Sequence, residues 1–251
     1  MPKPERLGAA DLVGRLQRII ASRGIPVVEI ADGPDPTEPG HPEFHRARRI
    51  EFAHARWAAA TPRRYQHATA THPDVTAWAS AVAAAMAKPG DDPIIVPSLL
   101  LTGPTGTGKT HQAYGALRAI ADSAPRRRFG LIATTSADMY GDLRPTGQPG
   151  AAEHRLKRLA EIPLLLIDDL GSAKASEWTE EVTYRLINER YNECRPTIFT
   201  SNLPSRAPRD EQGRPTGPDL TAALGERIVS RLAEMTTVIA IAGPDRRRAA
   251  A

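Results

Sequence analysis

GPTGTGKT, at residues 103–110, is the stretch of this 251-residue sequence that decides its fold class. It matches the phosphate-binding pattern G-x-x-x-x-G-K-[ST] at every fixed position. Its glycines allow backbone conformations in which successive N–H groups point inward at phosphate oxygens. The lysine supplies a mobile cation for the β and γ phosphates of ATP, and the final threonine supplies a hydroxyl that can ligate Mg²⁺. The predicted nucleotide-binding residues are Gly103, Pro104, Thr105, Gly106, Thr107, Gly108, Lys109, Thr110 and His111.

The sequence around this loop has the order of elements that a phosphate loop requires. A strand-like apolar run precedes it, and a helical stretch at residues 110–121 follows it, so that the positive end of the helix is directed at the phosphates. Further apolar runs alternate with helical stretches, which is the pattern of a parallel sheet covered on both faces. We therefore predict an α/β fold. The predicted strands are Ser98–Thr102, Phe129–Thr134, Leu164–Asp168, Thr197–Thr200 and Val238–Ala242.

Polar side chains stand where two of these predicted strands end. Asp168 ends one strand and Asp169 follows it, while Asn202 lies just past the next strand along the chain. Side chains at the carboxyl ends of parallel strands face the ligand crevice. We expect Asp168 and Thr110 to hold Mg²⁺, and Asp169 to orient or deprotonate the attacking water. Asn202 is expected to hydrogen-bond the γ-phosphate or that water.

The order of these motifs resembles that of the AAA+ ATPases of the DnaC/IstB group, which includes replicative helicase loaders and transposition helper ATPases. The motifs are GPTGTGKT, LLLIDDLG (164–171), TIFTSN (197–202) and LGERIVSRL (224–232). The resemblance covers about residues 94–242 and extends more weakly over residues 61–78. It implies a three-layer α/β/α P-loop AAA+ core with a five-stranded parallel sheet. It also implies that no C-terminal lid follows the last strand.

The resemblance also assigns roles to single residues. Asp168 and Asp169 fall on the Walker B motif, Lys109 is the Walker A lysine, and Asn202 falls on sensor 1. The arginine finger would be Arg231 or, as the second candidate, Arg227, and it would complete the ATP site of a neighbouring subunit in a homo-oligomer. Many AAA+ proteins have glutamate in place of the shorter Asp169. We therefore expect a slow ATP hydrolase that acts as a switch.

The chain before the phosphate loop divides into two predicted segments. Residues 1–42 form an arm and linker, because apolar spacing at residues 9–22 predicts an amphipathic helix and residues 31–42 are rich in proline, glycine and acids. Residues 43–92 form a helical adaptor, with predicted helices at 43–60 and 75–87, the latter burying Trp78 and Val82. Residues 93–251 form the ATPase domain. By resemblance, the arm would bind a replicative ring helicase.

The positive balance of the chain does not by itself indicate a nucleic-acid partner. The formal net charge is +4, and 28 of the 33 basic residues are arginine, which a solvated arginine-rich surface explains as well. In the resembled group, the region between the second and third strands touches single-stranded DNA, and basic residues beside an aromatic suit that role. Ordinary solvated helix faces are the alternative. The candidates are Tyr140, Arg144, His154, Arg155, Lys157 and Arg158. We interpret the arginine clusters at residues 126–128 and 246–248 as surface charge.

Composition excludes several other classes. The single cysteine, Cys194, excludes an intrachain disulfide framework and a multi-cysteine zinc site. No stretch approaches the ~20 apolar residues of a membrane span, and no signal-peptide core is present, so we expect a cytoplasmic protein with no membrane partner. An ATP-dependent helicase loader acting on single-stranded DNA is the first interpretation. The alternatives are an IstB-like transposition helper on duplex DNA, a small-molecule P-loop kinase and a nucleotide-binding scaffold without turnover.

Overall fold

The computed structural model describes residues 9–23, 35–90, 94–145, 150–208 and 210–246. The chain divides into two compact units, residues 1–46 and 47–251. In the first unit, α1 spans Ala9–Ser22, which confirms the helix predicted there. Of the predicted linker at 31–42, residues 31–34 lie outside the described residues. No helix in the described ranges is long and apolar enough to cross a membrane.

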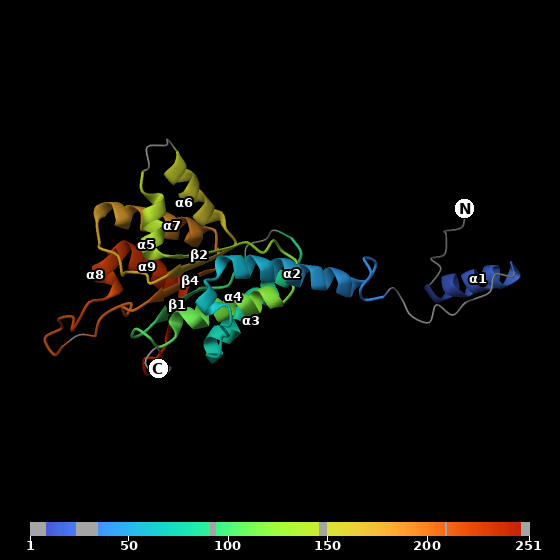
Figure 1. Ribbon diagram of the computed structural model, residues 1–251, viewed down its shortest axis with the longest axis horizontal. Coiled ribbons are helices and arrows are strands. Elements are labelled where there is room, and N and C mark those ends of the chain that lie inside the picture. Colours follow the sequence, from blue (N-terminus) through green and yellow to red (C-terminus); the bar gives the residue numbers. More distant parts are fainter. Residues whose placement is uncertain (1–8, 24–34, 91–93, 146–149, 209, 247–251) are drawn as a thin grey trace, which may run out of the picture. The chain divides into compact units, whose positions relative to one another are not determined.

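The second unit is built on a five-stranded parallel sheet in the order β2-β3-β4-β1-β5. Figure 1 shows β4 between β2 and β1. The fold-class prediction is therefore confirmed. Three strands begin where the sequence predicted, but β2 begins two residues later and β5 two residues earlier. β5 starts early because it leaves α9 directly, and its first two residues are β-branched threonines, which favour strands without being apolar. The strands are β1 (Ser98–Thr102), β2 (Leu131–Thr135), β3 (Leu164–Asp168), β4 (Thr197–Ser201) and β5 (Thr236–Ala240).

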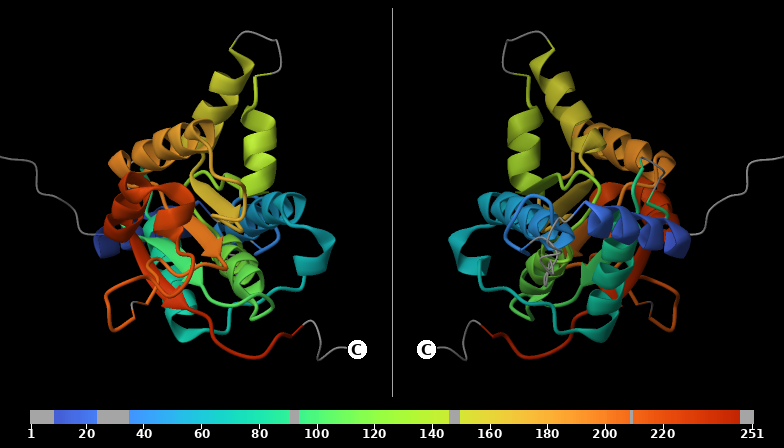
Figure 2. Two further views of the ribbon diagram at one scale, coloured as in Figure 1. Left: turned by 90° about the vertical axis from the view of Figure 1, so that its left-hand side faces the viewer. Right: turned by 90° about the vertical axis from the view of Figure 1, so that its right-hand side faces the viewer.

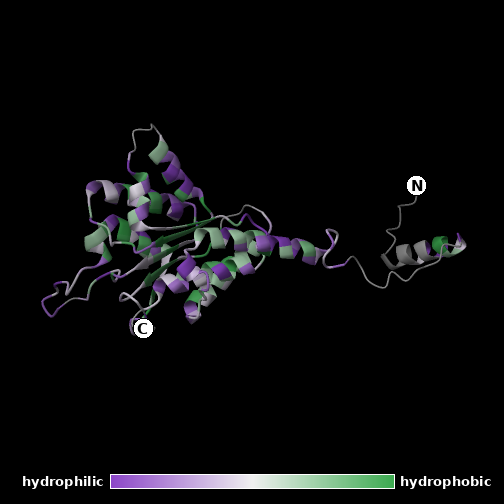
Figure 3. Ribbon diagram, viewed as in Figure 1, coloured by the Kyte–Doolittle hydropathy of each residue, from purple (hydrophilic) through white to green (hydrophobic). Residues whose placement is uncertain are grey.

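Alternate side chains of the strands enter two separate hydrophobic cores, which produces three layers. Leu99, Leu101 and Leu166 belong to the core beneath one face, whereas Leu100 and Ile167 belong to the core beneath the other. Helices cover both faces, as the two views of Figure 2 show. Strand β3 is hydrophobic from Leu164 to Ile167, while the helices contain both hydrophilic and hydrophobic residues (Figure 3). A continuous apolar run is what a strand buried on both faces requires.

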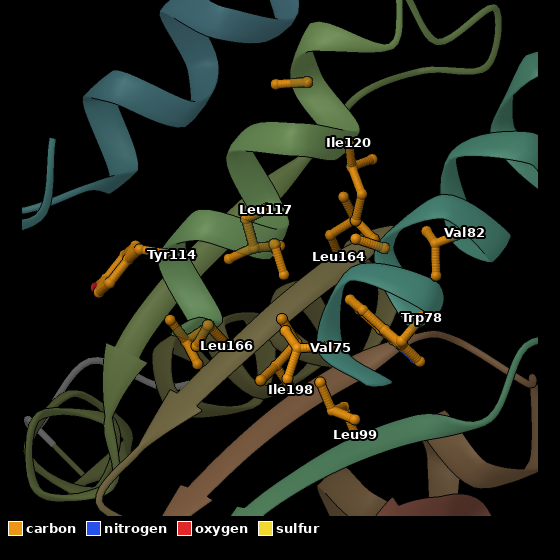
Figure 4. Packing of buried hydrophobic residues seen from close by; sticks show 14 of the residues in the cluster. Val75, Trp78, Val82, Leu99, Tyr114, Leu117, Ile120, Leu164, Leu166 and Ile198 are labelled. Atoms are coloured by element: carbon orange, nitrogen blue, oxygen red, sulfur yellow. The ribbon is translucent and has the colours of Figure 1, made fainter. Parts of the chain in front are cut away.

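One layer consists of helices from before and after the phosphate loop. Trp78 and Val82 pack with Leu117 and Ile120 against the sheet, so the predicted buried side of this helix is confirmed (Figure 4). Residues 47–90 therefore share a core with the sheet, which places them in the same compact unit as the phosphate loop. The elements are α2 (Pro42–Ala60), the 3₁₀ turn η1 (Arg63–Tyr65), α3 (Pro73–Ala87) and α4 (Lys109–Asp122).

The other layer contains the helices that follow β2, β3 and β4. Arg190, on α7, is 1% exposed, and its guanidinium donates hydrogen bonds to carbonyls at the end of α6 and before β4. Helix α7 was not predicted, since the polar Glu177–Asn192 stretch carries a weak apolar stripe. The elements are α5 (Ser136–Leu143), α6 (Ala151–Glu161), α7 (Glu177–Asn192), α8 (Leu220–Leu224) and α9 (Glu226–Met235).

Candidate nucleotide site

The phosphate loop joins the end of β1 to the start of α4. Gly103, Gly106 and Gly108 have φ values of 139°, 85° and 101°, which non-glycine residues rarely adopt. Gly108 is the N-cap of α4 in the left-handed conformation, and the helix begins at Lys109. Within the loop, the Thr107 hydroxyl donates to the Pro104 carbonyl at 3.0 Å. The predicted loop geometry is thus present, and the first turn of α4 begins directly after it.

The Lys109 ammonium lies between the loop and the end of β4. Its Nζ donates to the carbonyls of Gly103 and Pro104 and to Oδ1 of Asn202, each at 2.8 Å. The side chain is 5% exposed. The cation is therefore fixed at the carboxyl edge of the sheet, and the predicted sensor residue Asn202 is within bonding distance of it.

Asp168 is linked to the loop by the hydroxyl predicted to ligate the metal. Thr110 Oγ1 donates to Asp168 Oδ1 at 2.9 Å, and the Thr200 hydroxyl donates to the same oxygen. Burial raises the pKa of Asp168, while these two hydrogen bonds and Lys109 act in the opposite direction. A hydroxyl beside a carboxylate provides the hard oxygen ligands that Mg²⁺ uses with substrate phosphates. In the described part of the chain, no group of three or more His, Cys, Asp or Glu residues could hold a metal ion.

Asp169 is held in a left-handed backbone conformation, with φ 54°, at the end of β3. Its N–H donates to Thr200 Oγ1 at 3.0 Å, and its carbonyl accepts from the Ser136 hydroxyl at 2.8 Å. Asn202 Nδ2 lies 3.3 Å from Asp169 Oδ1. Two bonds to neighbouring elements thus fix a conformation that costs energy for a non-glycine residue, and the carboxylate is directed toward Asn202.

Lys109, Thr110, Asp169 and Asn202 line one cavity of about 270 Å³, whereas Asp168 reaches it only through its hydrogen bond with Thr110. Three of its residues were not predicted for the site: Arg64 and Tyr65, from η1, and Arg246, which follows β5. Tyr65 stacks on Tyr114 with ring centroids 5.1 Å apart and an interplanar angle of 14°. The only signal for η1 in the sequence was the weak resemblance of residues 61–78 to the DnaC/IstB group. The lining residues are Arg64, Tyr65, Gly106, Gly108, Lys109, Thr110, His111, Asp169, Asn202 and Arg246.

His111 connects the cavity to the segment between η1 and α3. Its Nε2 accepts a hydrogen bond from the Thr69 N–H at 3.3 Å. Burial lowers the pKa of His111, and the charge of Arg246 lowers it further. Only the neutral imidazole can accept this bond at Nε2, so the lowered pKa and the hydrogen bond favour the same form.

Comparison with known proteins agrees with this geometry. A family model described as IstB-like ATP binding protein matches residues 96–248. The chain belongs to this family. An ATP-binding protein of insertion sequence IS1162 from Pseudomonas fluorescens is 34% identical over 108 residues, which is 43% of this chain and 45% of that protein. The replicative helicase loader DnaC of Escherichia coli strain K12 is 26% identical over 139 residues, or 55% of this chain and 50% of the loader.

Solved structures support the same relationship. A crystal structure of the DnaC helicase loader aligns with 72% of this IstB-like chain and 100% of its own chain, with 26% identity and a TM-score of 0.56. A crystal structure of DnaI shares the fold at a TM-score of 0.54 and 22% identity. The resemblance to the DnaC/IstB group is thus confirmed. The chain spans about half the length of the curated relatives it matches.

The two arginine-finger candidates of this IstB-like chain lie away from its own nucleotide cavity. Arg231 lies over the Tyr191 ring, with Cζ 4.7 Å from the ring centroid, and Arg227 lies over the Tyr184 ring at 6.0 Å. Both line a separate surface hollow between α7 and α9, with Glu234. The assignment of either to a neighbouring subunit stays a prediction.

One residue of the predicted DNA surface was wrongly assigned. Tyr140 is 7% exposed, and its hydroxyl lies 2.6 Å from Thr183 Oγ1, so its ring packs against α7 and is not available to a base. It faces inward because it lies on the same side of α5 as the buried residues Met139 and Leu143. Among the basic candidates, Arg155 is half-buried and donates a hydrogen bond to the Asp142 carbonyl. The exposed ones are Arg144, His154, Lys157 and Arg158.

Proposed function

We propose that this chain binds ATP with Mg²⁺ in the cavity at the phosphate loop and hydrolyses it slowly. One observation carries the proposal: Lys109, Asp169 and Asn202 line the same cavity, and Thr110, in that cavity, is hydrogen-bonded to Asp168. Membership of an ATP-binding family supports it.

Each side chain has a separate task in this proposal. Lys109 neutralises charge on the β and γ phosphates. Thr110 and Asp168 hold Mg²⁺, which when bound offsets the remaining phosphate charge. Asp169 orients the attacking water and accepts its proton, and Asn202 keeps that carboxylate in place. Because the carboxylate is one methylene shorter than glutamate and fixed by its backbone, we expect slow turnover.

Substitution of the proposed base tests hydrolysis separately from binding. Asp169→Asn keeps the size and the hydrogen bond but cannot accept a proton. We expect nucleotide affinity to be retained and ATP hydrolysis to fall by about 100-fold or more. Asp142→Asn, at an exposed position on α5, is the matched control and should hydrolyse ATP at the normal rate. If Asp169→Asn were fully active, the chain would need another base.

We further propose that Arg231 or Arg227 acts on the site of a neighbouring subunit. Their place on the α7–α9 surface, outside the cavity of their own chain, supports this arrangement. Subunits carrying Lys109→Ala should restore hydrolysis when mixed with inactive subunits carrying Arg231→Ala, because the mixed interface joins an intact loop to an intact finger. If mixing with Lys109→Ala subunits restores ATP hydrolysis to neither Arg231→Ala nor Arg227→Ala subunits, an arginine finger supplied in trans is contradicted.

As the biological role, we propose loading of a replicative ring helicase onto single-stranded DNA, with residues 1–42 as the helicase-binding arm and residues 144–158 at the DNA. The likeness to the DnaC loader structure over 72% of the chain supports it. The second candidate is a transposition helper, which the identity to insertion-sequence ATP-binding proteins favours. Pull-down with a ring helicase and with a transposase, followed by an ATP-dependent loading assay, separates the two roles.

A further inference from the structure

The segment that follows β5 runs along the phosphate loop. The Ile241 N–H donates to the Thr102 carbonyl at 2.7 Å, and the Arg246 N–H donates to the Gly106 carbonyl at 3.0 Å. Two backbone bonds, five residues apart, thus hold residues 241–246 beside the loop. We define this stretch as the C-terminal strap.

The loop glycines leave room for this strap. A Cβ on Gly103 would collide with the Ile241 carbonyl, and a Cβ on Gly106 would collide with the Asp245 carboxylate. The glycines of the phosphate motif are therefore needed for close approach of the strap as well as for their positive φ values. The strap therefore packs directly against the backbone of the phosphate loop.

The side chain of Arg246 extends from the strap into the nucleotide cavity. Its Nη1 and Cζ lie 3.6 and 3.7 Å from the position that a Cβ on Gly108 would occupy. The residue lines the cavity together with Lys109 and His111, and it is exposed. A guanidinium is therefore present at the end of the loop where α4 begins.

We infer that Arg246 is a nucleotide-binding residue whose guanidinium contacts the α- or β-phosphate of the nucleotide bound in the same subunit. This rests on the proposed function, in which ATP occupies the cavity. The backbone of the glycine-rich loop cradles the α and β phosphates, and Gly108 ends that loop. Lys109 and Asn202 are bonded to each other on the side where the γ-phosphate is expected. Arginine pairs with phosphate oxygens in a bidentate, charge-assisted manner, so this position suits it.

The affinities of the full chain for ADP and for ATP, measured by calorimetry at fixed salt, test this inference. Arg246→Ala should weaken both by about 10-fold or more and by similar factors, because both nucleotides carry the contacted phosphates. Arg246→Lys should restore part of the loss. Arg206→Ala, which removes an exposed arginine outside the cavity, is the matched control and should bind normally. Unchanged affinities for Arg246→Ala, or a loss confined to ATP, would overturn the inference.

Two truncations provide an independent measurement. A chain that ends after Arg246 should bind nucleotide like the full chain, whereas a chain that ends after Pro244 should bind as weakly as Arg246→Ala. Equal affinity of both truncated chains for ADP would contradict a role for the strap. Lys109→Ala distinguishes failure of this inference from failure of the proposed function. If Lys109→Ala binds ATP as tightly as the unmodified chain, or if neither chain binds ATP, the proposed function fails. If only Lys109→Ala loses binding and Arg246→Ala does not, the inference alone fails.

Discussion

At the scale of the single residue, Arg190 holds the junction of α6, α7 and β4. It is almost fully buried, and its donors satisfy carbonyls at the C-terminal end of α6 that have no partner within the helix. Arg190→Met should lower the free energy of unfolding by about 3 kcal/mol, because several buried carbonyls lose their donors at once. The acceptors are the carbonyls of Leu159, Ala160, Ile162 and Pro196 and the hydroxyl of Thr197.

Urea denaturation measures this loss, and Arg185→Met provides the comparison. Arg185 also lies on α7, but it forms an exposed ion pair with Glu153. Exposed pairs of this kind contribute about 0–1 kcal/mol. Similar losses for both variants would show that burial of the Arg190 guanidinium contributes nothing beyond a surface ion pair.

His111 makes stability depend on pH. In the unfolded chain its imidazole is protonated below about pH 6.5, whereas burial and Arg246 lower its pKa in the folded chain. Its stabilising contribution is therefore complete above pH ~6.5 and is lost as the pH falls from there toward the folded-state pKa. His111→Gln keeps an acceptor for Thr69 without titrating, so unfolding free energies measured between about pH 7 and 5 should depend less on pH. The slope for His154→Gln, at an exposed position, should match that of the unmodified chain.

At the scale of the element, the approach of α4 to the segment before α3 depends on Gly115. A Cβ at this position would collide with the backbone of Thr69 and Ala70. Gly115→Ala should therefore lower the melting temperature, although alanine has the higher helix propensity by about 1 kcal/mol. Gly141→Ala, within α5, is the matched control, since a Cβ there meets nothing within 4 Å. It should raise the melting temperature; a rise in both variants would mean that the two segments separate at little cost.

The elements also show what the sequence could and could not predict. Strands buried on both faces, such as Leu164–Asp168, were located correctly because a short continuous apolar run between helical stretches is typical of a central parallel strand. Helix α7 escaped prediction because two of its five buried residues, Thr183 and Arg190, are polar, which weakens the apolar periodicity. Tyr140 was misassigned because its environment depends on α7, which is far away in the sequence.

The same distinction applies to the candidate site. The phosphate loop, Asp168, Asp169 and Asn202 could be predicted because each follows a strand, and parallel strands end at one edge of the sheet. Arg246 could not, since its cluster at 246–248 has the composition of surface charge. Its place beside Gly108 follows from the pairing of β5 with β1, which sequence alone does not specify.

At the scale of the whole molecule, nucleotide binding belongs to the larger compact unit. The described residues that line the cavity lie between Arg64 and Arg246, within residues 47–251. A chain that begins at Glu43 should therefore bind ATP with the affinity and thermal stability of the full chain. If the proposed loader role is correct, it should no longer bind a replicative ring helicase. Calorimetry and pull-down measure the two properties, and loss of ATP binding would show that the arm belongs to the folded core.

The sheet order has a consequence for how the protein is made. The interior strand β1 pairs with β4 and β5, whose partner residues Ile198 and Thr237 lie about 100 and 140 positions after Leu99. During synthesis, the apolar β1 and the phosphate loop therefore emerge long before either neighbouring strand exists. Such distant pairings fold slowly and leave hydrophobic segments exposed on the ribosome. The cavity at the phosphate loop is therefore complete only after Arg246, which follows β5, has been translated.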